Sequence, residues 1–271
     1  MAPPVAGRRA RRMTEAPSPD SLTASTFLPS PNFGDRRSPL RPDSIILHYT
    51  GMPTAEGALA VLRDPASEVS AHYFVRESGE IAQLVREEKR AWHAGVGSWG
   101  RQTDLNSASI GIEIANPGHA GGSPPFPREQ IDAVVALCRD IASRWAIRPE
   151  RILAHSDIAP ARKIDPGEAF PWEVLARAGV GHWTPPAPIV GGPLFSAAQE
   201  GPPIRALQAM LALYGYGVDI SGVYDRQTKI VVTAFQRHFR PDRVDGEADA
   251  STITTLRALI DALGLGAPAG A

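Results

Sequence analysis

Three residues with metal-binding side chains lie at the ends of short apolar segments. His48 and His155 each close a run of strand length, and Asp165 lies in the loop that follows His155. Two imidazoles and one carboxylate can hold a zinc ion in three positions and leave a fourth position open for water. His48, His155 and Asp165 are therefore candidate ligands of one Zn²⁺ ion.

Each of these residues also has an ordinary structural explanation. A histidine at a strand end is more often a hydrogen-bonded surface residue than a ligand, and an aspartate before Pro166 can form an Asx turn. Lys163 alone is typical of a solvated surface charge. Glu113 is harder to explain in this way, because a carboxylate inside an apolar strand is costly unless it is paired or functional. The combination favours a functional site.

Segments that alternate between strand and helix patterns would position these residues. Helical spacing covers residues 56–63 and 127–145, and Pro127 opens the second helix. Strand patterns cover five segments, which are residues 44–49, 71–75, 81–85, 109–116 and 152–155. This alternation predicts an α/β sheet whose polar residues gather along one edge.

The segment 109–116 has strict alternation. Successive side chains of a strand point to opposite faces, so the three isoleucines of residues 110–114 share one face and Gly111, Glu113 and Ala115 lie on the other. Glu113 is thus a lone carboxylate on a face of small residues.

Composition limits the function classes. A chain of 271 residues with 43% hydrophobic and 21% charged residues is ordinary for globular protein, and its length predicts two domains with tails. The 28 basic and 29 acidic residues give no electrostatic indication of nucleic-acid binding. No run is long enough to span a membrane. The single cysteine, Cys138, excludes an internal disulfide and is expected to be a buried thiol.

The first 26 residues are rich in Pro, Arg and Ser, and we expect them to form a disordered tail. No apolar segment of the signal-peptide kind follows the basic residues, which favours a cytoplasmic location. A misassigned start codon leaves the periplasm or cell envelope as the alternative.

A second domain is predicted after a segment that has neither a helix nor a strand pattern. Residues 183–199 are rich in Pro and Gly and are typical of a semi-stiff linker. Residues 200–263 then show apolar residues at helical spacing, which predicts a small domain of three short helices with these residues in its core. Residues 264–271 are expected to be a flexible tail.

The first predicted domain covers residues 27–182, and from about residue 27 to residue 180 it resembles the zinc N-acetylmuramoyl-L-alanine amidases of the AmpD and AmiD type. The resemblance rests on motifs in consistent order, which are His48-Tyr49-Thr50, Ser70-Ala71-His72-Tyr73, Trp92-His93-Ala94-Gly95, Ile110-Gly111-Ile112-Glu113, His155-Ser156-Asp157-Ile158-Ala159-Pro160 and Arg162-Lys163-Ile164-Asp165-Pro166-Gly167. It implies a mixed central sheet flanked by helices, a fold that this family shares with peptidoglycan recognition proteins.

The same resemblance implies a role for each matching residue. The zinc ligands would be His48, His155 and Asp165, which is the set that the chemistry alone proposes. Glu113 matches the catalytic acid and base, and Lys163 matches the residue that stabilises the transition state. Four further residues match positions along the substrate cleft, where we expect substrate contact or support of the site: His72, Tyr73, His93 and Asn116.

The resemblance also implies a reaction. The enzyme would cleave the amide bond between the lactyl group of muramic acid and L-alanine, in peptidoglycan or in anhydromuropeptides, during cell-wall turnover or recycling. We expect it to act as a monomer. A non-catalytic muropeptide-sensing protein on the same fold is the alternative, and a zinc peptidase that cuts within the stem peptide is a third possibility.

Residues 200–263 resemble the three-helix peptidoglycan-binding domain that accompanies many cell-wall hydrolases. Its turns carry motifs such as Gly222-Val223-Tyr224-Asp225-Arg226-Gln227-Thr228. Asp225 and Thr228 fit either a helix cap or a glycan contact. Attached to an amidase, such a domain would raise the local concentration of substrate.

Overall fold

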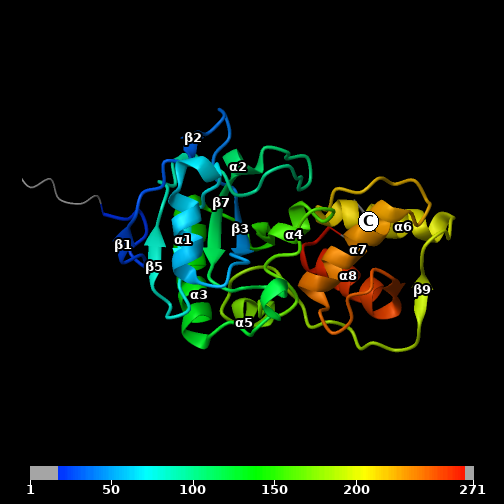
Figure 1. The fold of residues 1–271 in the computed structure, drawn as a ribbon. Helices are drawn as coiled ribbons and strands as arrows, with labels where there is room; N and C mark the ends of the chain where they lie inside the picture. The colour runs from blue at the N-terminus through cyan, green and yellow to red at the C-terminus, as the bar shows by residue number, and fades with distance from the viewer. Residues whose placement is uncertain (1–17, 266–271) are drawn as a thin grey trace, which may run out of the picture.

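The five predicted strands and a sixth that was not predicted, β1, assemble into one mixed sheet in the computed structural model, which describes residues 18–265 (Figure 1). The strand order is β1-β5-β4-β7-β3-β8. Strands β4, β7, β3 and β8 run parallel to one another, and β5 is antiparallel to β4. The bounds are Thr26–Phe27 (β1), Ser44–Tyr49 (β3), Tyr73–Val75 (β4), Ile81–Gln83 (β5), Ser109–Ile114 (β7) and Ile152–Ala154 (β8).

Helices cover both faces of this sheet. On one face, α3 (Arg128–Trp145) and α5 (Trp172–Arg177) pack against the isoleucines of β7. On the other face, α1 (Ala55–Arg63) packs against Phe74 of β4. The strand alternation therefore divides β7 as predicted, with its isoleucines under α3 and with Gly111 and Glu113 on the opposite face.

Shorter elements connect the layers. A separate antiparallel pair is formed by β2 (Phe33–Asp35) and β6 (Lys89–Ala91). The remaining helices of this domain each have three or four residues and are α2 (Leu105–Ala108), α4 (His155–Ile158), η1 (Pro65–Ser67), η2 (His119–Gly121) and η3 (Pro149–Arg151).

The three predicted C-terminal helices are α6 (Pro202–Tyr214), α7 (Arg226–Phe239) and α8 (Ala250–Ala262). Their apolar faces form a shared core, as helical spacing predicts. Asp225 caps α7, because its Oδ1 accepts hydrogen bonds from the Thr228 N–H and hydroxyl at 2.8 Å each. Asp225 and Thr228 therefore form a helix cap, which is one of the two roles that the sequence allows.

The segment 183–199 is only in part a free linker. Within it, β9 (Pro193–Phe195) pairs with β10 (Ala248–Asp249) of the three-helix domain. Ala187 also donates to Thr255 on α8 and accepts from Ser251. The prediction of a linker extending to residue 199 is therefore wrong for these residues, because a Pro/Gly-rich chain can still lie along a folded surface.

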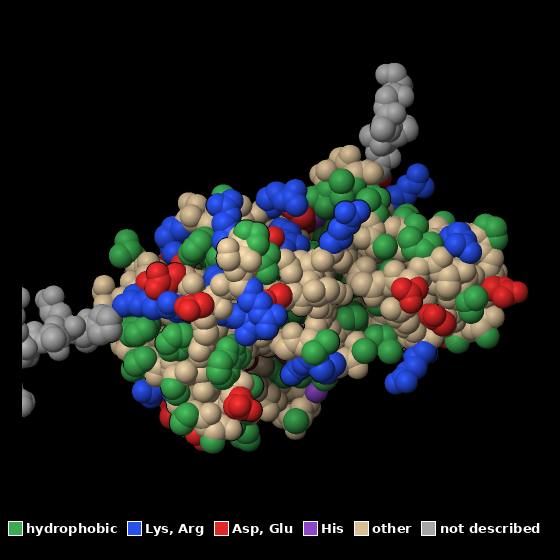
Figure 2. Space-filling model, turned by 90° about the horizontal axis from the view of Figure 1, so that it is seen from above, with side chains coloured by type: hydrophobic (Ala, Val, Ile, Leu, Met, Phe, Trp, Pro, Cys, Tyr) green, Lys and Arg blue, Asp and Glu red, His purple; other side chains and the backbone are tan. Residues whose placement is uncertain are grey.

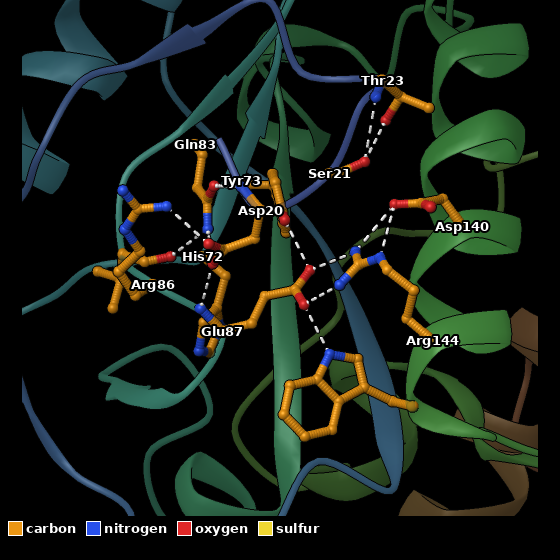
Figure 3. Close-up of polar contacts among 12 residues, drawn as sticks. Asp20, Ser21, Thr23, His72, Tyr73, Gln83, Arg86, Glu87, Asp140 and Arg144 are labelled. Atoms are coloured by element: carbon orange, nitrogen blue, oxygen red, sulfur yellow. Dashed lines mark hydrogen bonds and ion pairs between the residues drawn. The ribbon is translucent and has the colours of Figure 1, made fainter. Parts of the chain in front are cut away.

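The predicted N-terminal tail extends too far along the chain. Residues 1–17 lie outside the described residues, but residues 18–26 pack on the sheet edge. Asp20 bonds Gln83 and Arg86 (Figure 3), and Thr26 pairs with Ala82. The expectation of disorder up to residue 26 is thus wrong for 18–26, since backbone pairing with an edge strand needs no apolar pattern. Of the predicted C-terminal tail, residues 266–271 lie outside the described part.

The two domains share one hydrophobic cluster. Ile46, Leu153 and Ile158 of the first domain pack with residues of α6, α7 and α8. On the face drawn in Figure 2, Lys and Arg side chains are interspersed with Asp and Glu. Across residues 18–265, the helices are all too short or too polar to cross a lipid bilayer.

Candidate active site

His48, His155 and Asp165 converge at one point. His48 lies near the end of β3 and His155 begins α4 directly after the neighbouring parallel strand β8. The Nδ1 atoms of the two histidines are 2.8 Å apart, and Asp165 Oδ2 lies 3.1 Å from His48 Nδ1 and 3.0 Å from His155 Nδ1. All three side chains are buried. Two ring nitrogens and a carboxylate oxygen in this arrangement fit a zinc ion.

A run of hydrogen bonds fixes which nitrogen of His48 faces this point. Ser109 Oγ donates to the Leu105 carbonyl at 2.5 Å, so the same oxygen accepts from His93 Nε2 at 3.2 Å. His93 is neutral because burial lowers its pKa well below the usual value, which leaves its Nδ1 as an acceptor. His48 Nε2 then donates to His93 Nδ1 at 3.0 Å. The lone pair of His48 is therefore on Nδ1, where a metal ligand requires it.

The charge states of the cluster also suit a cation. Burial, together with the neighbouring His155, lowers the pKa of His48 to about 4, so its imidazole is neutral at pH 7. Burial alone would raise the pKa of Asp165, but the adjacent side chains of His155 and His48 lower it below its ordinary value. On its far side, His155 Nε2 donates to the Ala94 carbonyl at 3.0 Å. The set is two imidazoles, each with a nitrogen facing the cluster, and a carboxylate.

Glu113 lies beside this cluster. Parallel pairing of β3 with β7 places Glu113 opposite His48. Its Oε2 is inaccessible to solvent and makes no hydrogen bond to any described residue. Burial, and next the charge of Asp165, raise the pKa of Glu113 to about 8, while Lys163 acts in the opposite sense. A carboxyl group with this pKa can both accept and release a proton near neutral pH.

One cavity of about 260 Å³ contains all five residues: His48, Glu113, His155, Lys163 and Asp165. Its other wall is apolar and comes largely from α1 and the segment after it, with Ala58, Val61, Leu62 and Val69. Apolar walls with a few convergent polar groups are typical of small-molecule sites. The cavity thus joins the candidate metal ligands to an acid–base group and a cation.

His93 lies over the small face of β7. A Cβ atom at position 111 would overlap the His93 ring, so only glycine fits there. His93 also lines the cavity. It therefore combines the predicted position along the cleft with a hydrogen bond to His48.

Two predicted cleft residues lie elsewhere. Tyr73 is fully buried and its hydroxyl donates to Glu87, whose carboxylate also pairs with Arg144 (Figure 3). His72 is fully buried as well, and its Nδ1 accepts from the Gly111 N–H. Because the protein encloses both side chains, their positions favour support of the site over substrate contact, the two roles predicted for Tyr73 and His72. His72 instead supports β7 next to Glu113.

Asn116 is the third such residue. It is buried, its side-chain amide donates to the Pro124 carbonyl at 3.1 Å, and its Oδ1 accepts from the Gly118 N–H at 2.8 Å. It lies outside the cavity that contains Glu113. Asn116 therefore shapes the loop after β7, which favours support of the site over substrate contact.

Some residues of the site had no signal of their own in the sequence. Ser109 was assigned only to a strand, although its hydroxyl determines the orientation of His93. Met52, which precedes α1, and Leu62 of α1 form part of the apolar wall, although the helical periodicity of Leu62 alone places it in a core. Only the packing of α1 beside the ligand cluster reveals them.

Comparison with protein families matches both domains. Residues 38–168 match the family described as N-acetylmuramoyl-L-alanine amidase, and residues 200–256 match the putative peptidoglycan binding domain. The first match contains all five residues of the cavity cluster, and the second contains most of the three-helix domain.

Individual relatives agree with this division. N-acetylmuramoyl-L-alanine amidase AmiD of Escherichia coli is 42% identical over 233 residues, which cover 81% of this chain and 83% of AmiD. The structure of E. coli AmiD in complex with anhydro-N-acetylmuramic acid-L-Ala-D-gamma-Glu-L-Lys superposes with a TM-score of 0.71 at 36% identity, covering 86% of this chain and 99% of that one. AmpDh3 from Pseudomonas aeruginosa in complex with anhydromuramic pentapeptide gives a TM-score of 0.67 at 32% identity, with coverages of 84% and 95%.

Proposed function

Because the chain belongs to the N-acetylmuramoyl-L-alanine amidase family, we propose that it cleaves the lactyl–L-alanine amide of muropeptides in cell-wall recycling. The observation that carries this proposal is the cavity that contains His48, His155, Asp165, Glu113 and Lys163 together. The relatives that were solved with anhydromuramic peptides support a substrate of this class.

The proposal assigns a Zn²⁺ ion to His48, His155 and Asp165. Two imidazoles and a carboxylate are a donor set that zinc prefers, and each imidazole has a partner on its far nitrogen. Zinc, when bound, supplies Lewis acidity that polarises the scissile carbonyl and acidifies a water molecule. The protein residues around it bind the substrate and move the protons.

Glu113 is assigned the proton transfers. As a base, its carboxylate removes the proton of the attacking water, and the protonated carboxyl then gives that proton to the departing alanine nitrogen. An amide nitrogen leaves poorly as an anion, so this second transfer is needed. The raised pKa, about 8, suits both steps.

Lys163 is assigned to the negative charge that develops on the former carbonyl oxygen. Its side chain lines the same cavity as Glu113. A cation positioned in a partly dehydrated cavity stabilises such a charge more strongly than one in water. The products are a muramyl sugar and a free stem peptide whose amino terminus is L-alanine.

A direct test uses the purified full-length protein, loaded with zinc and incubated with an anhydromuropeptide. Mass spectrometry of the products should identify the intact stem peptide and the free anhydromuramic sugar. His155→Ala, measured in parallel, should lose stoichiometric zinc because one of three ligands is gone. A protein without stoichiometric zinc, or one whose products start at a residue other than L-alanine, would contradict the proposal.

The form of the physiological substrate is tested in the same assay. We propose soluble anhydromuropeptides as substrates, in line with the ligands of the two solved relatives. Intact sacculi, incubated side by side at equal muramic acid content, should be cleaved more slowly. Faster release of stem peptide from sacculi would reassign the enzyme to polymeric peptidoglycan.

A further inference from the structure

The loop that carries three of the five candidate site residues also touches the three-helix domain. Residues 155–168, named here the ligand loop, contain His155, Lys163 and Asp165. Helix α4 at its start contacts α7. In Figure 1, α4 lies between the sheet and the three-helix domain.

Asp157 is the principal point of contact. Its side chain is completely buried, two residues after His155. Oδ1 accepts from the Tyr216 hydroxyl at 2.7 Å, and Oδ2 accepts from the Ala154 N–H at 2.8 Å and from His238 Nδ1 at 2.7 Å. Two of the three donors to this buried carboxylate thus come from the three-helix domain. A buried carboxylate without such partners would be strongly destabilising.

Aromatic packing holds the two donors in place. The His238 ring stacks on Trp172 with centroids 3.7 Å apart. Tyr216 packs edge-on against Trp99 at 4.9 Å, and Ile158 of α4 lies in the same hydrophobic cluster. The hydroxyl and the ring nitrogen therefore have fixed positions relative to the amidase domain.

A second contact lies at the other end of the ligand loop. Arg237, the neighbour of His238 on α7, bonds Glu168 Oε2 through Nε at 3.1 Å. The same oxygen contacts His119 Nε2 at 3.1 Å. Because the Glu168 side chain is 37% exposed, this pair contributes less than the Asp157 cluster. The end of α7 nevertheless contacts both ends of the loop.

From these contacts we propose that the three-helix domain positions the zinc ligands, with Asp157 as the positioning residue. This inference rests on the proposed function, since it assumes that His155 and Asp165 bind zinc. Tyr216 and His238 fix Asp157, Asp157 fixes the Ala154 N–H at the start of α4, and His155 is the next residue. The domain is then a structural part of the amidase site, in addition to any binding of cell-wall polymer.

The test compares two full-length variants at the same interface. Tyr216→Phe removes the hydroxyl that contacts Asp157 and keeps the ring, whereas Tyr214→Phe removes a buried hydroxyl that bonds His182 at 2.8 Å. The zinc dissociation constant is measured by competition with a chelator, and the melting temperature is measured without metal. Tyr216→Phe should weaken zinc binding roughly tenfold, as partners beyond the ligands typically do. Tyr214→Phe should stay within about twofold, since it lacks the path to His155.

A second pair of variants, both at His238, distinguishes a loss of the positioning contact from a general loss of folding. His238→Asn keeps an N–H donor near Asp157 and should retain zinc affinity, while His238→Leu fills the space without a donor and should lose it. Equal zinc affinities within each pair would overturn the positioning role and leave the proposed amidase intact. Failure of the wild-type protein to bind zinc would overturn the proposed function itself, and this inference with it.

Discussion

Glu113 and His48 face each other across two parallel strands, β7 and β3, so that an acid–base group adjoins a candidate zinc ligand. The register that pairs them is fixed by the neighbouring pairs Leu47 with Ile112 and Tyr49 with Ile114. A slip of one residue would turn Glu113 towards α3 and bury it in an apolar core. The sheet thus sets the geometry on which the chemistry depends.

Glu113→Gln should keep zinc binding and lose turnover. Gln has the same shape but cannot accept the proton of the attacking water, and general acid–base catalysis typically contributes about 10²–10⁴-fold in rate. The measurement is kcat on an anhydromuropeptide, with zinc content determined on the same sample. A rate near that of the wild-type protein would show that another group moves the proton.

The metal-free protein should become less stable relative to Glu113→Gln as the pH rises. The unfolded chain releases the Glu113 proton near the usual pKa of 4.5, whereas the folded protein retains it up to about 8. In that window the folded state binds more protons, so the free energy of unfolding falls with increasing pH. Melting temperatures in chelator from about pH 5 to about pH 8.5 give the test. A constant difference between the two proteins would contradict a raised Glu113 pKa.

Lys163→Ala should lower kcat by about 10²–10³-fold, which is typical of removing one group that stabilises a developing oxyanion. Lys163→Arg keeps the charge and should recover part of the rate. Zinc content should be unchanged in both variants, because neither alters the ligands. Similar rates for the Ala and Arg variants would indicate that the charge of Lys163 has no role in the reaction.

Ser109→Ala should weaken zinc binding. It removes the acceptor for His93 Nε2, so the tautomer that leaves the His48 lone pair on Nδ1 is no longer enforced. Ser44 is the matched control, because it is also a buried serine, pairs with Ser109 in the sheet and donates to the Ala108 carbonyl. Chelator competition should give a loss of roughly tenfold for Ser109→Ala alone. An equal loss of zinc affinity in Ser109→Ala and Ser44→Ala would indicate a general effect on the sheet and not an effect through His93.

Gly111→Ala should destabilise the protein by about 1–3 kcal/mol, because the added methyl overlaps the His93 ring. Gly34→Ala, on β2, is the control, since a Cβ there meets no atom within 4 Å. Denaturant unfolding measures both. The displaced His93 should also weaken zinc binding in the Gly111 variant, so unchanged stability and affinity would show that the ring moves aside freely.

The amino-acid sequence by itself determined much of the fold and of the candidate site. Alternation in 109–114 predicted which face of β7 carries Glu113, because strand side chains alternate whatever lies above them. The ligand set followed from donor chemistry and from positions at strand ends. Parallel strands that end at the same sheet edge bring such residues together, and the pairing of Leu47 with Ala154 does this for His48 and His155.

Tertiary structure alone decided the rest. Tyr73 follows His72 within one motif, and only the packing of Glu87 and α3 shows that its hydroxyl points away from the cavity. Likewise, Asp157 and Tyr216 are 59 positions apart in the chain, and no local pattern links them. Contacts of this kind form between the surfaces of two folded domains. The spacing of residues along the chain does not determine them. The domain expected to be a tethered module is therefore, in the folded protein, packed against the site.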